Sequence, residues 1–416
     1  MKRADVMKFK IPLIHIKDVS INVLAFGLYI AIQQIFIMPY LSKNTSEIEF
    51  SNIILFITIF NIVSVVLGDE LGNTRIIRNN LYSEKKIRGD FDYIYLLVVI
   101  ITIVLGFVVN LFVRIDWVVY LIYLTIIILG ITRYYSMSYF KMKQNFHKIL
   151  LTNIFYGIGA LLGVFVTTKV QFNLAPFLFG EILSLVFVIS MSINDKEQKV
   201  SFNKTVEFSR SFMVFSQLGL LAMLMNLITY LDRIVIFPIL GAVAMATYYG
   251  ASSMSKMISL VFNPISGVVL AKLSTINSRH KDQVISKIIP LLTPLILSAF
   301  LGSLVLSYLG VRFLYPQYLY NATSLLVPIS LATALSVVSL ILKPVIMTFF
   351  ETKNLMMINF VYAFVFCVSM YLFSDYWGIV GFAWAASLGR ASQFGCYLWV
   401  IKRNRIKSRG IQSNDI

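Results

Sequence analysis

The sequence predicts an all-α integral membrane protein, with twelve transmembrane helices arranged as two six-helix lobes around a central cavity. Its composition is the first reason, since 58% of the 416 residues are hydrophobic and 13% are charged, which is far more apolar than a water-soluble domain. The second is a succession of twelve long apolar stretches separated by short polar loops. The third is that Lys and Arg gather in alternate loops, as they do in proteins that cross a membrane many times.

Most of the apolar stretches are long enough for one helix to cross a membrane. A helix needs about 20 residues to span about 30 Å of hydrocarbon, and only helices fit segments of this length. In the first half of the chain the expected spans are 19–41, 48–71, 92–113, 117–141, 149–167 and 174–193, and in the second half they are 210–237, 242–271, 287–310, 320–350, 354–374 and 378–401.

The basic residues orient these spans. With both termini in the cytoplasm, 27 of the 36 Lys and Arg residues lie on the cytoplasmic side, whereas Lys43, Arg114, Lys169 and Arg312 lie on the opposite side. This asymmetry is the one that the positive-inside rule describes. We therefore expect a multi-pass protein with both termini cytoplasmic, in which residues 1–18 lead into an uncleaved signal anchor.

The longest polar interval inside the chain divides the spans six and six. We predict an N-terminal lobe at 1–193, a cytoplasmic linker at 194–209, a C-terminal lobe at 210–402 and a basic cytoplasmic tail at 403–416. Six spans return the chain to its starting side, so two such lobes would share one orientation in the membrane.

Several classes of function lack their sequence signatures. No G-x-x-x-x-G-K-[ST] phosphate loop occurs, and Gly157, Gly159 and Gly163 lie inside an apolar span, where small residues favour close helix packing over nucleotide binding. The three histidines are far apart in sequence, so we expect neither a metal site nor a cofactor. The net charge of +17 is explained by loops beside membrane lipid headgroups, and we expect no nucleic-acid partner. The longest outer loop, about 311–319, leaves no room for an extracytoplasmic catalytic domain, and we expect a transporter, not an enzyme.

Ionisable residues inside the spans are the main candidates for a functional site, because a lone charge in hydrocarbon costs about 2.5 kcal/mol or more. Arg133, Lys256 and Arg390 lie about 24, 21 and 18 Å from the outer ends of their helices, near the midplane. Lys343 lies deeper toward the cytoplasm. We expect these four bases to bind an anionic substrate in a hydrated cavity between the lobes, and the alternative is that each pairs with a neighbouring helix or reaches a lipid headgroup.

Three further charged residues have more than one interpretation. Glu181 would either take up a coupling proton or sodium ion or neutralise Arg133, and the second interpretation is favoured. Asp232 and Arg233, toward the outer end of the seventh span, are candidate gate residues. Adjacent positions on a helix point about 100° apart, so their side chains are expected to find other partners.

Two segments resemble a known family. Residues 230–236 (YLDRIVI), 240–241 (LG) and 248–251 (YYGA) are similar to the seventh-to-eighth helix signature of polysaccharide flippases, which belong to the multidrug/oligosaccharidyl-lipid/polysaccharide exporter superfamily. Residues 133–141 are similar to another recurrent stretch of that family, and the resemblance extends over the whole chain in length and layout. The sequence departs from the family where Ala246 and Thr247 precede Tyr248, because a glycine is common there.

The resemblance implies a flippase of the bacterial inner membrane. Such a protein would move an undecaprenyl-pyrophosphate-linked oligosaccharide across the cytoplasmic membrane by alternating access, for O-antigen, capsule or exopolysaccharide synthesis. A polymerase and a chain-length regulator would be its partners, and a proton or sodium ion could drive it. The alternatives are a cation-coupled multidrug exporter of the same superfamily and a membrane enzyme that acts on lipid-linked glycans.

Overall fold

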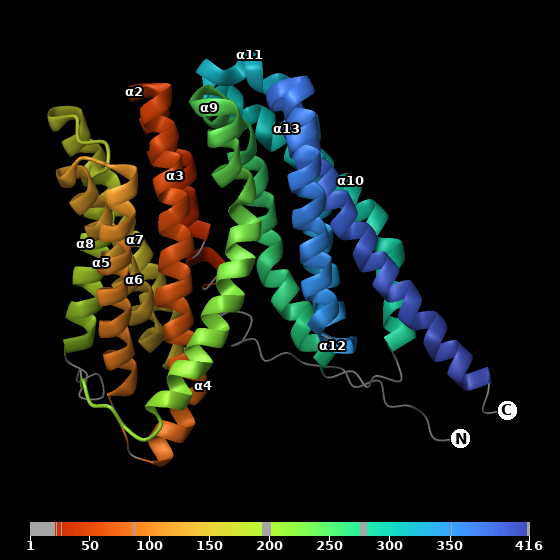
Figure 1. The fold of residues 1–416 in the computed structure, drawn as a ribbon, viewed down its shortest axis with the longest axis horizontal. Helices are drawn as coiled ribbons and strands as arrows, with labels where there is room; N and C mark the ends of the chain where they lie inside the picture. Colours follow the sequence, from red (N-terminus) through yellow and green to blue (C-terminus); the bar gives the residue numbers. More distant parts are fainter. Residues whose placement is uncertain are drawn as a thin grey trace. The chain divides into compact units, whose positions relative to one another are not determined.

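The computed structural model describes residues 21–193, 201–274, 281–350 and 352–413, apart from residues 22, 26, 86 and 88. Throughout these residues every regular element is a helix (Figure 1). The predicted anchor at 1–18, the first seven residues of the predicted linker and the last three of the tail lie outside the described residues.

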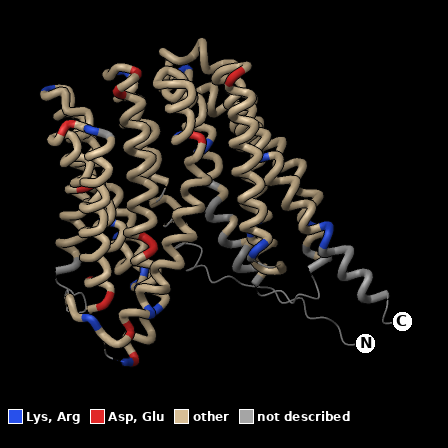
Figure 2. The backbone as a smooth tube through the Cα atoms, in the orientation of Figure 1, with Lys and Arg blue, Asp and Glu red and all other residues tan. Residues whose placement is uncertain are grey.

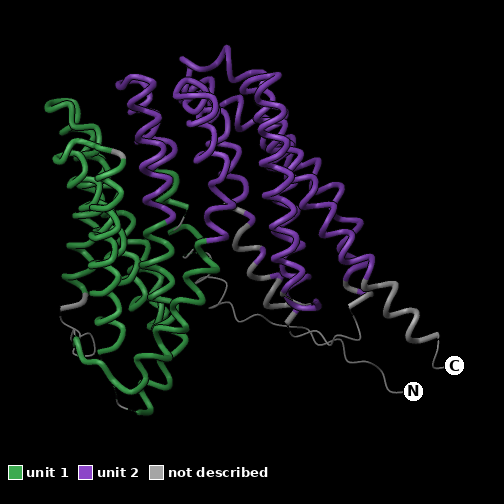
Figure 3. The backbone as a smooth tube through the Cα atoms, in the orientation of Figure 1, with its two compact units in different colours: residues 1–32, 63–223 green, residues 33–62, 224–416 purple. Residues whose placement is uncertain are grey.

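The chain divides into two compact units (Figure 3). Unit 1 contains residues 1–32 and 63–223, and unit 2 contains residues 33–62 and 224–416. The sequence assigns residues 33–62 to the N-terminal lobe, but here they pack with unit 2, where the Ser51 hydroxyl donates to the Ala242 carbonyl over 2.8 Å. That residues 194–209 link two membrane-spanning lobes of six helices each remains a prediction.

Unit 1 is built from five main helices and three segments that continue into unit 2, one of which is the described helical stretch before residue 33. The helices are α4 (Glu70–Glu84), α5 (Asp90–Val113), α6 (Trp117–Met142), α7 (Phe146–Val170) and α8 (Ala175–Ile193). The π-helical turn η2 (Val65–Asp69) joins α4 to the end of α3 (Glu47–Ser64), and the first turns of α9 (Phe208–Ser274) complete the unit. Local signals set the starts of two helices: the Asp116 carboxylate accepts from the backbone N–H groups of residues 118 and 119, and the Asn145 side chain accepts from that of residue 148.

Glycines set the close packing of α7 against α8. A Cβ on Gly163 would lie 2.5 Å from the Ala175 carbonyl carbon, and a Cβ on Gly159 would lie 2.8 Å from the carbonyl carbon of Phe179. A Cβ on Gly157 would lie 2.5 Å from the end of the Ile32 side chain. The predicted packing role is confirmed for Gly159 and Gly163, since a Cβ there would meet backbone atoms of α8, whereas the neighbour of Gly157 is the flexible end of a side chain.

Unit 2 begins with η1 (Ile32–Ile37), α2 (Met38–Asn44) and most of α3. It continues through the rest of α9, α10 (Lys281–Leu314), η5 (Pro316–Tyr318), α11 (Leu319–Ala322), η6 (Thr323–Leu325), α12 (Leu326–Phe349) and α13 (Thr352–Ser413). The chain reverses inside α9 at Gly241, with φ 80° and ψ −175°, and inside α13 at Gly378, with φ 55° and ψ −133°. Glycine adopts such angles without a Cβ penalty, and both turns fall where the sequence predicts one span to end and the next to begin.

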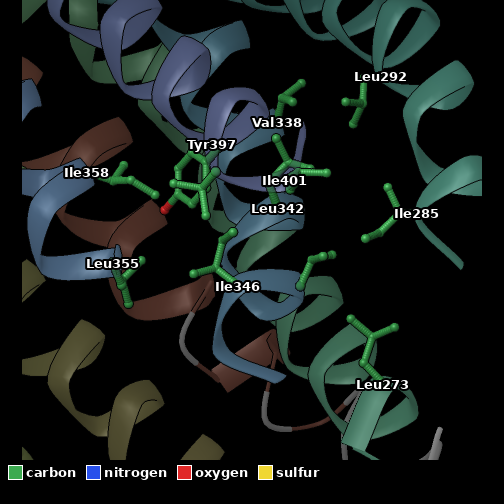
Figure 4. Close-up of a cluster of buried hydrophobic side chains, with 12 residues drawn as sticks. Leu273, Ile285, Leu292, Val338, Leu342, Ile346, Leu355, Ile358, Tyr397 and Ile401 are labelled. Carbon is green, nitrogen blue, oxygen red and sulfur yellow. The ribbon is translucent and has the colours of Figure 1, made fainter. Parts of the chain in front are cut away.

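An apolar core joins four helices of unit 2 (Figure 4). Its fully buried members include Leu273 of α9, Ile285 of α10, Ile346 of α12 and Ile401 of α13, residues that lie far apart in the sequence. Burial of each such side chain contributes about 1.5–3 kcal/mol in water, and in a bilayer its close packing replaces contacts with lipid. The core therefore fixes how the helices that carry the charged residues of unit 2 lie against each other.

The helices identify a multi-pass membrane protein. Nine helices among the described residues are long and apolar enough to cross a membrane, and Ala175–Met191 is a shorter apolar helix. Two of the nine, within α9 and α13, each continue through a glycine reversal. Figure 2 shows that in each unit most charged residues lie near the helix ends, and that a few lie at intermediate depth. The count of twelve spans remains a prediction.

The described part of the predicted linker, residues 201–209, belongs to unit 1 and makes contacts with α4 and α5. The carboxylate of Asp90 accepts from the backbone N–H of Thr205 over 2.7 Å, and that of Glu207 contacts Arg78 over 2.6 Å and Lys85 over 2.5 Å. The hydrogen bond from Lys85, with the charges of Lys85 and Arg78, lowers the pKa of Glu207. The contacts of Glu207 with Lys85 and Arg78 are therefore present at neutral pH and are lost as the pH falls through the lowered pKa of Glu207.

Candidate functional site

The first charged cluster lies in unit 1, where α6 supplies Arg133 and α8 supplies Glu181. Nε of Arg133 donates to Oε2 of Glu181 over 2.7 Å, and Nη2 donates to Oε1 over 3.0 Å. Both side chains are 1% exposed. This is a bidentate ion pair closed to solvent, the geometry in which an arginine and a carboxylate interact most strongly.

Tyrosine rings enclose the arginine of this pair. The guanidinium carbon lies 4.8 Å from the ring centre of Tyr29, 4.5 Å from that of Tyr134 and 5.4 Å from that of Tyr156. Gly180 makes room for one of them, since a Cβ there would lie 2.8 Å from Cε2 of Tyr156. The π faces stabilise the cation where water is excluded.

The Arg133–Glu181 pair settles one alternative from the sequence. The pairing favoured for Glu181 is present, because α8 supplies its carboxylate to Arg133, and for this base the alternative of pairing with a neighbouring helix holds in the structure. At 1% exposure Arg133 offers no donor to a ligand in this structure. Its role in substrate binding, like the coupling role of Glu181, stays a prediction.

The second charged cluster lies in unit 2 around Asp232. Oδ2 of Asp232 accepts from Nζ of Lys256 over 2.5 Å and from the hydroxyl of Tyr248 over 3.1 Å. Oδ1 accepts from the backbone N–H of Arg233 over 3.0 Å. The Asp232 side chain is 10% exposed and that of Lys256 is 34% exposed. Lys256 is therefore also paired, contrary to expectation, but it remains accessible.

The reversal at Gly241 brings Asp232 and Lys256 together. They lie on the two arms of α9, about 13 and 22 Å from the turn along the helix rise. A helical side chain points toward the N-terminus of its helix. The long side chain of Lys256 therefore reaches back toward the turn, and its ammonium group comes to the level of the Asp232 carboxylate. As predicted, the side chains of Asp232 and Arg233 do not pair with each other; Asp232 instead accepts the N–H of its neighbour.

Arg233 lies beside this carboxylate with aromatic neighbours. It is 6% exposed, and its guanidinium carbon lies 4.9 Å from the ring centre of Tyr249 and 5.7 Å from that of Tyr230. Nε of Arg233 is buried without a hydrogen-bond partner. The hydroxyl of Tyr249 donates to Oε1 of Gln34 over 2.7 Å, which ties the π-helical turn η1 to the cluster.

Arg390 of α13 has neutral partners. Its Nη1 donates to Oε1 of Gln393 over 2.9 Å, and its guanidinium carbon lies 4.3 Å from the ring centre of Tyr362. Gln393 in turn donates to Oδ1 of Asn359 over 3.0 Å. Among the residues that the structure describes, no carboxylate lies within 4 Å of Arg390. Arg390 therefore adds to unit 2 a half-buried cation whose described partners are neutral.

Lys343, the fourth predicted base, is half-buried on α12 next to Pro344. Within the described ranges it makes no ion pair, and the structure joins it to none of the other candidates. Its assignment to a substrate site remains a prediction.

The charges of unit 2 do not balance. We call Asp232, Arg233, Lys256 and Arg390 the unit 2 cluster: it contains three bases and one carboxylate. The described part of the chain contains no group of three or more His, Cys, Asp or Glu residues that could hold a metal ion. Two of the bases, Lys256 and Arg390, are half-buried and one, Arg233, is buried, and such an excess of positive charge within membrane-spanning helices suits the binding of an anion.

Unit 2 also carries an apolar groove of about 640 Å³ between α12 and α13. Its lining includes Leu331, Phe373, Trp377 and Trp384, and none of the charged candidates. A surface of this chemistry accepts hydrocarbon and not a charged group.

Sequence reasoning missed most of the polar partners. Tyr248, Tyr362, Asn359 and Gln393 were not predicted as partners of the charges, although the first belongs to the motif at 248–251. One signal was available: Arg390 and Gln393 are three residues apart, and such residues share a helix face. The contacts that cross between helices had no signal in a single sequence.

Comparisons with known proteins give the class of fold. No protein-family model matches the chain, and no curated protein sequence matches it. Among solved structures it is similar to the lipid II flippase MurJ in an inward closed conformation, with a TM-score of 0.73, 16% identity, and coverage of 92% of this chain and 87% of that one. It is also similar to an outward-facing multidrug resistance MATE transporter of the MOP superfamily, with a TM-score of 0.65, 13% identity, and coverage of 94% and 96%.

A third similar structure is a mutant of the Vibrio cholerae MATE transporter VcmN, with a TM-score of 0.62, 13% identity, and coverage of 94% and 97%. The chain therefore has the fold of MOP-superfamily membrane transporters over nearly its full length. At these identities the likeness establishes the fold alone, and the predicted all-α membrane fold class is confirmed.

Proposed function

We propose that this protein is a flippase that moves an undecaprenyl-pyrophosphate-linked oligosaccharide across the bacterial cytoplasmic membrane by alternating access. The observation that carries the proposal is the unit 2 cluster, in which three bases outnumber one carboxylate: Asp232 pairs with Lys256, and Arg390 has a neutral partner, within helices long enough to span a membrane. A diphosphate group supplies the negative charge that this cluster lacks. The fold shared with a lipid II flippase supports the same class of substrate.

The described contacts suggest different roles in substrate binding for the candidate residues. Lys256 and Arg390 are the proposed phosphate contacts, because both are accessible and Arg390 has neutral partners. Arg233, which is buried next to Asp232, adds positive potential, and Lys343 would contact the anion at another point of its path. A polymerase and a chain-length regulator would act on the product, and the proton or sodium gradient is the proposed source of energy.

Loss of the protein tests the proposal directly. In a bacterium that carries the gene, deletion should stop surface polysaccharide and should leave the lipid-linked oligosaccharide unpolymerised in the inner leaflet. Accumulation is measured by mass spectrometry of extracted lipids. Lys256→Gln and Arg390→Gln should each reduce the rate of surface polymer formation about tenfold or more, because each removes a charge-assisted contact with phosphate.

A matched control separates this effect from a general loss of basic charge. Lys287 is an exposed lysine of α10, and Lys287→Gln makes the same chemical change outside the cluster. It should leave polymer formation unchanged. Normal surface polymer in the deletion strain, or in both cluster variants with normal protein levels, would contradict the proposal.

A cation-coupled multidrug exporter is the second candidate, and the structural similarity to MATE transporters favours it. Such an exporter would bind cationic compounds, which three bases around one carboxylate repel. Expression in a strain that lacks its own exporters distinguishes the two. A rise in resistance to cationic dyes with no effect on polysaccharide would favour the exporter.

A further inference from the structure

The carboxylate of Asp232 accepts hydrogen bonds from groups that could otherwise donate to a bound anion. Its two carboxylate oxygens accept from the Lys256 ammonium, the Tyr248 hydroxyl and the backbone N–H of Arg233. The ammonium and the phenol are donor types that bind phosphate oxygens in proteins, whereas the backbone N–H of Arg233 lies inside α9 and its contact with Asp232 is local. The protein's own carboxylate therefore fills an anion-binding arrangement.

The exposures of the two partners differ in a way that permits exchange. The side chain of Asp232 is 10% exposed and held by three donors. That of Lys256 is 34% exposed and carries its ammonium group on a flexible four-carbon stem. Lys256 can rotate toward an arriving anion while Asp232 keeps its bonds to Tyr248 and to the backbone of Arg233. Arg390 of the same unit is held by the neutral side chain of Gln393, so its positive charge remains available to an anion.

From this arrangement we infer that Asp232 is an internal counter-anion that competes with the substrate for Lys256. The inference rests on the proposed function, because it assumes an anionic lipid-linked substrate. A ligand with one weak negative charge gains little by displacing Asp232, whereas a diphosphate offers more charge and more acceptor oxygens to Lys256 and Arg390 together. Asp232 thus sets a threshold of charge that selects diphosphate over monophosphate lipids.

The test measures binding of two lipids to the purified protein in detergent by native mass spectrometry. The probes are undecaprenyl diphosphate and undecaprenyl monophosphate. The wild-type protein should bind the diphosphate more tightly. Asp232→Asn should bind the monophosphate about tenfold more tightly than the wild type does, because Lys256 is no longer held in a pair, and the preference for diphosphate should narrow.

Asp375→Asn is the matched control, since it makes the same change at an exposed position of unit 2. It should leave both affinities unchanged. Lys256→Gln should weaken the binding of both lipids. If Asp232→Asn binds the monophosphate no more tightly than the wild type does, the inference is wrong while the proposed function stands. If the wild type binds neither lipid, the proposed function fails and the inference fails with it.

A double variant keeps the test open if Asp232→Asn is not obtained as a folded protein. Asp232→Asn combined with Arg233→Gln removes one acid and the adjacent buried base, so the net charge of the cluster is unchanged. The double variant should bind the monophosphate about tenfold more tightly than Arg233→Gln alone. Lys256 has no carboxylate partner in the double variant, whereas it stays paired with Asp232 in Arg233→Gln. Equal binding of the two variants overturns the inference.

Discussion

At the scale of single residues, the contrast between Arg133 and Arg390 separates two uses of a buried cation. Arg133 has a bidentate carboxylate, three tyrosine rings and 1% exposure, so its charge is fully satisfied inside unit 1. Arg390 is half-buried and hydrogen-bonded to a neutral glutamine. A closed pair holds helices in place, whereas an incompletely paired base can still accept a ligand.

The closed pair predicts a strong effect from removal of one partner. Glu181→Gln should lower thermal stability sharply, since breaking a buried pair costs about 3–5 kcal/mol by leaving a charge uncompensated. The combined change Arg133→Met with Glu181→Leu removes both charges and should recover most of that stability. Melting in detergent, followed by size-exclusion chromatography, gives the measurement.

The same variants test the predicted part of this pair in transport. If the pair serves only to hold α6 and α8 together, the double variant should restore surface polymer along with stability. A stable double variant without polymer would instead give Arg133 or Glu181 the substrate or coupling role that the sequence suggested. A Glu181→Gln protein as stable as the wild type would contradict the structural role.

At the scale of helices, glycine determines where elements touch and where they reverse. Gly163 lets α7 approach the first turn of α8, and Gly241 reverses α9 so that Asp232 and Lys256 meet. The sequence predicts both features in outline, because small residues in an apolar span favour packing and the predicted spans break at Gly241. It does not reveal which carboxylate reaches which base, since that depends on how far apart the arms lie.

Opposite effects of one chemical change test this role of glycine. Gly163→Ala should lower stability by about 1–3 kcal/mol, because its Cβ would lie 2.5 Å from backbone atoms of Ala175 and Pro176 that cannot move aside. Gly395→Ala in α13 should keep or slightly raise stability, because nothing lies within 4 Å of its Cβ and alanine favours the helix. The two melting temperatures in detergent are compared with that of the wild type. Equal melting temperatures would contradict the packing role.

At the scale of the whole molecule, the orientation in the membrane is a prediction from charge alone. Tyr320, which is 93% exposed, lies at the predicted outer side, and the exposed Ser83 lies at the predicted cytoplasmic side. With Cys367 and Cys396 replaced by alanine, Tyr320→Cys in intact cells should react with a membrane-impermeant maleimide, because few basic residues mark its side of the membrane. Ser83→Cys should react after the cells are opened. The reverse pattern would invert the topology.

Several parts of this protein followed from the sequence by itself: the helical class, the membrane setting, the positions of the reversals and the presence of charges at intermediate depth. They follow because hydrophobicity and helix length are local properties, and one span must satisfy its own backbone in lipid. The tertiary structure alone decided that Glu181 closes on Arg133, that Asp232 holds Lys256 and that residues 33–62 pack with unit 2. These contacts join residues 24 or more positions apart, and local patterns in a single sequence do not reveal which faces of two packed helices meet.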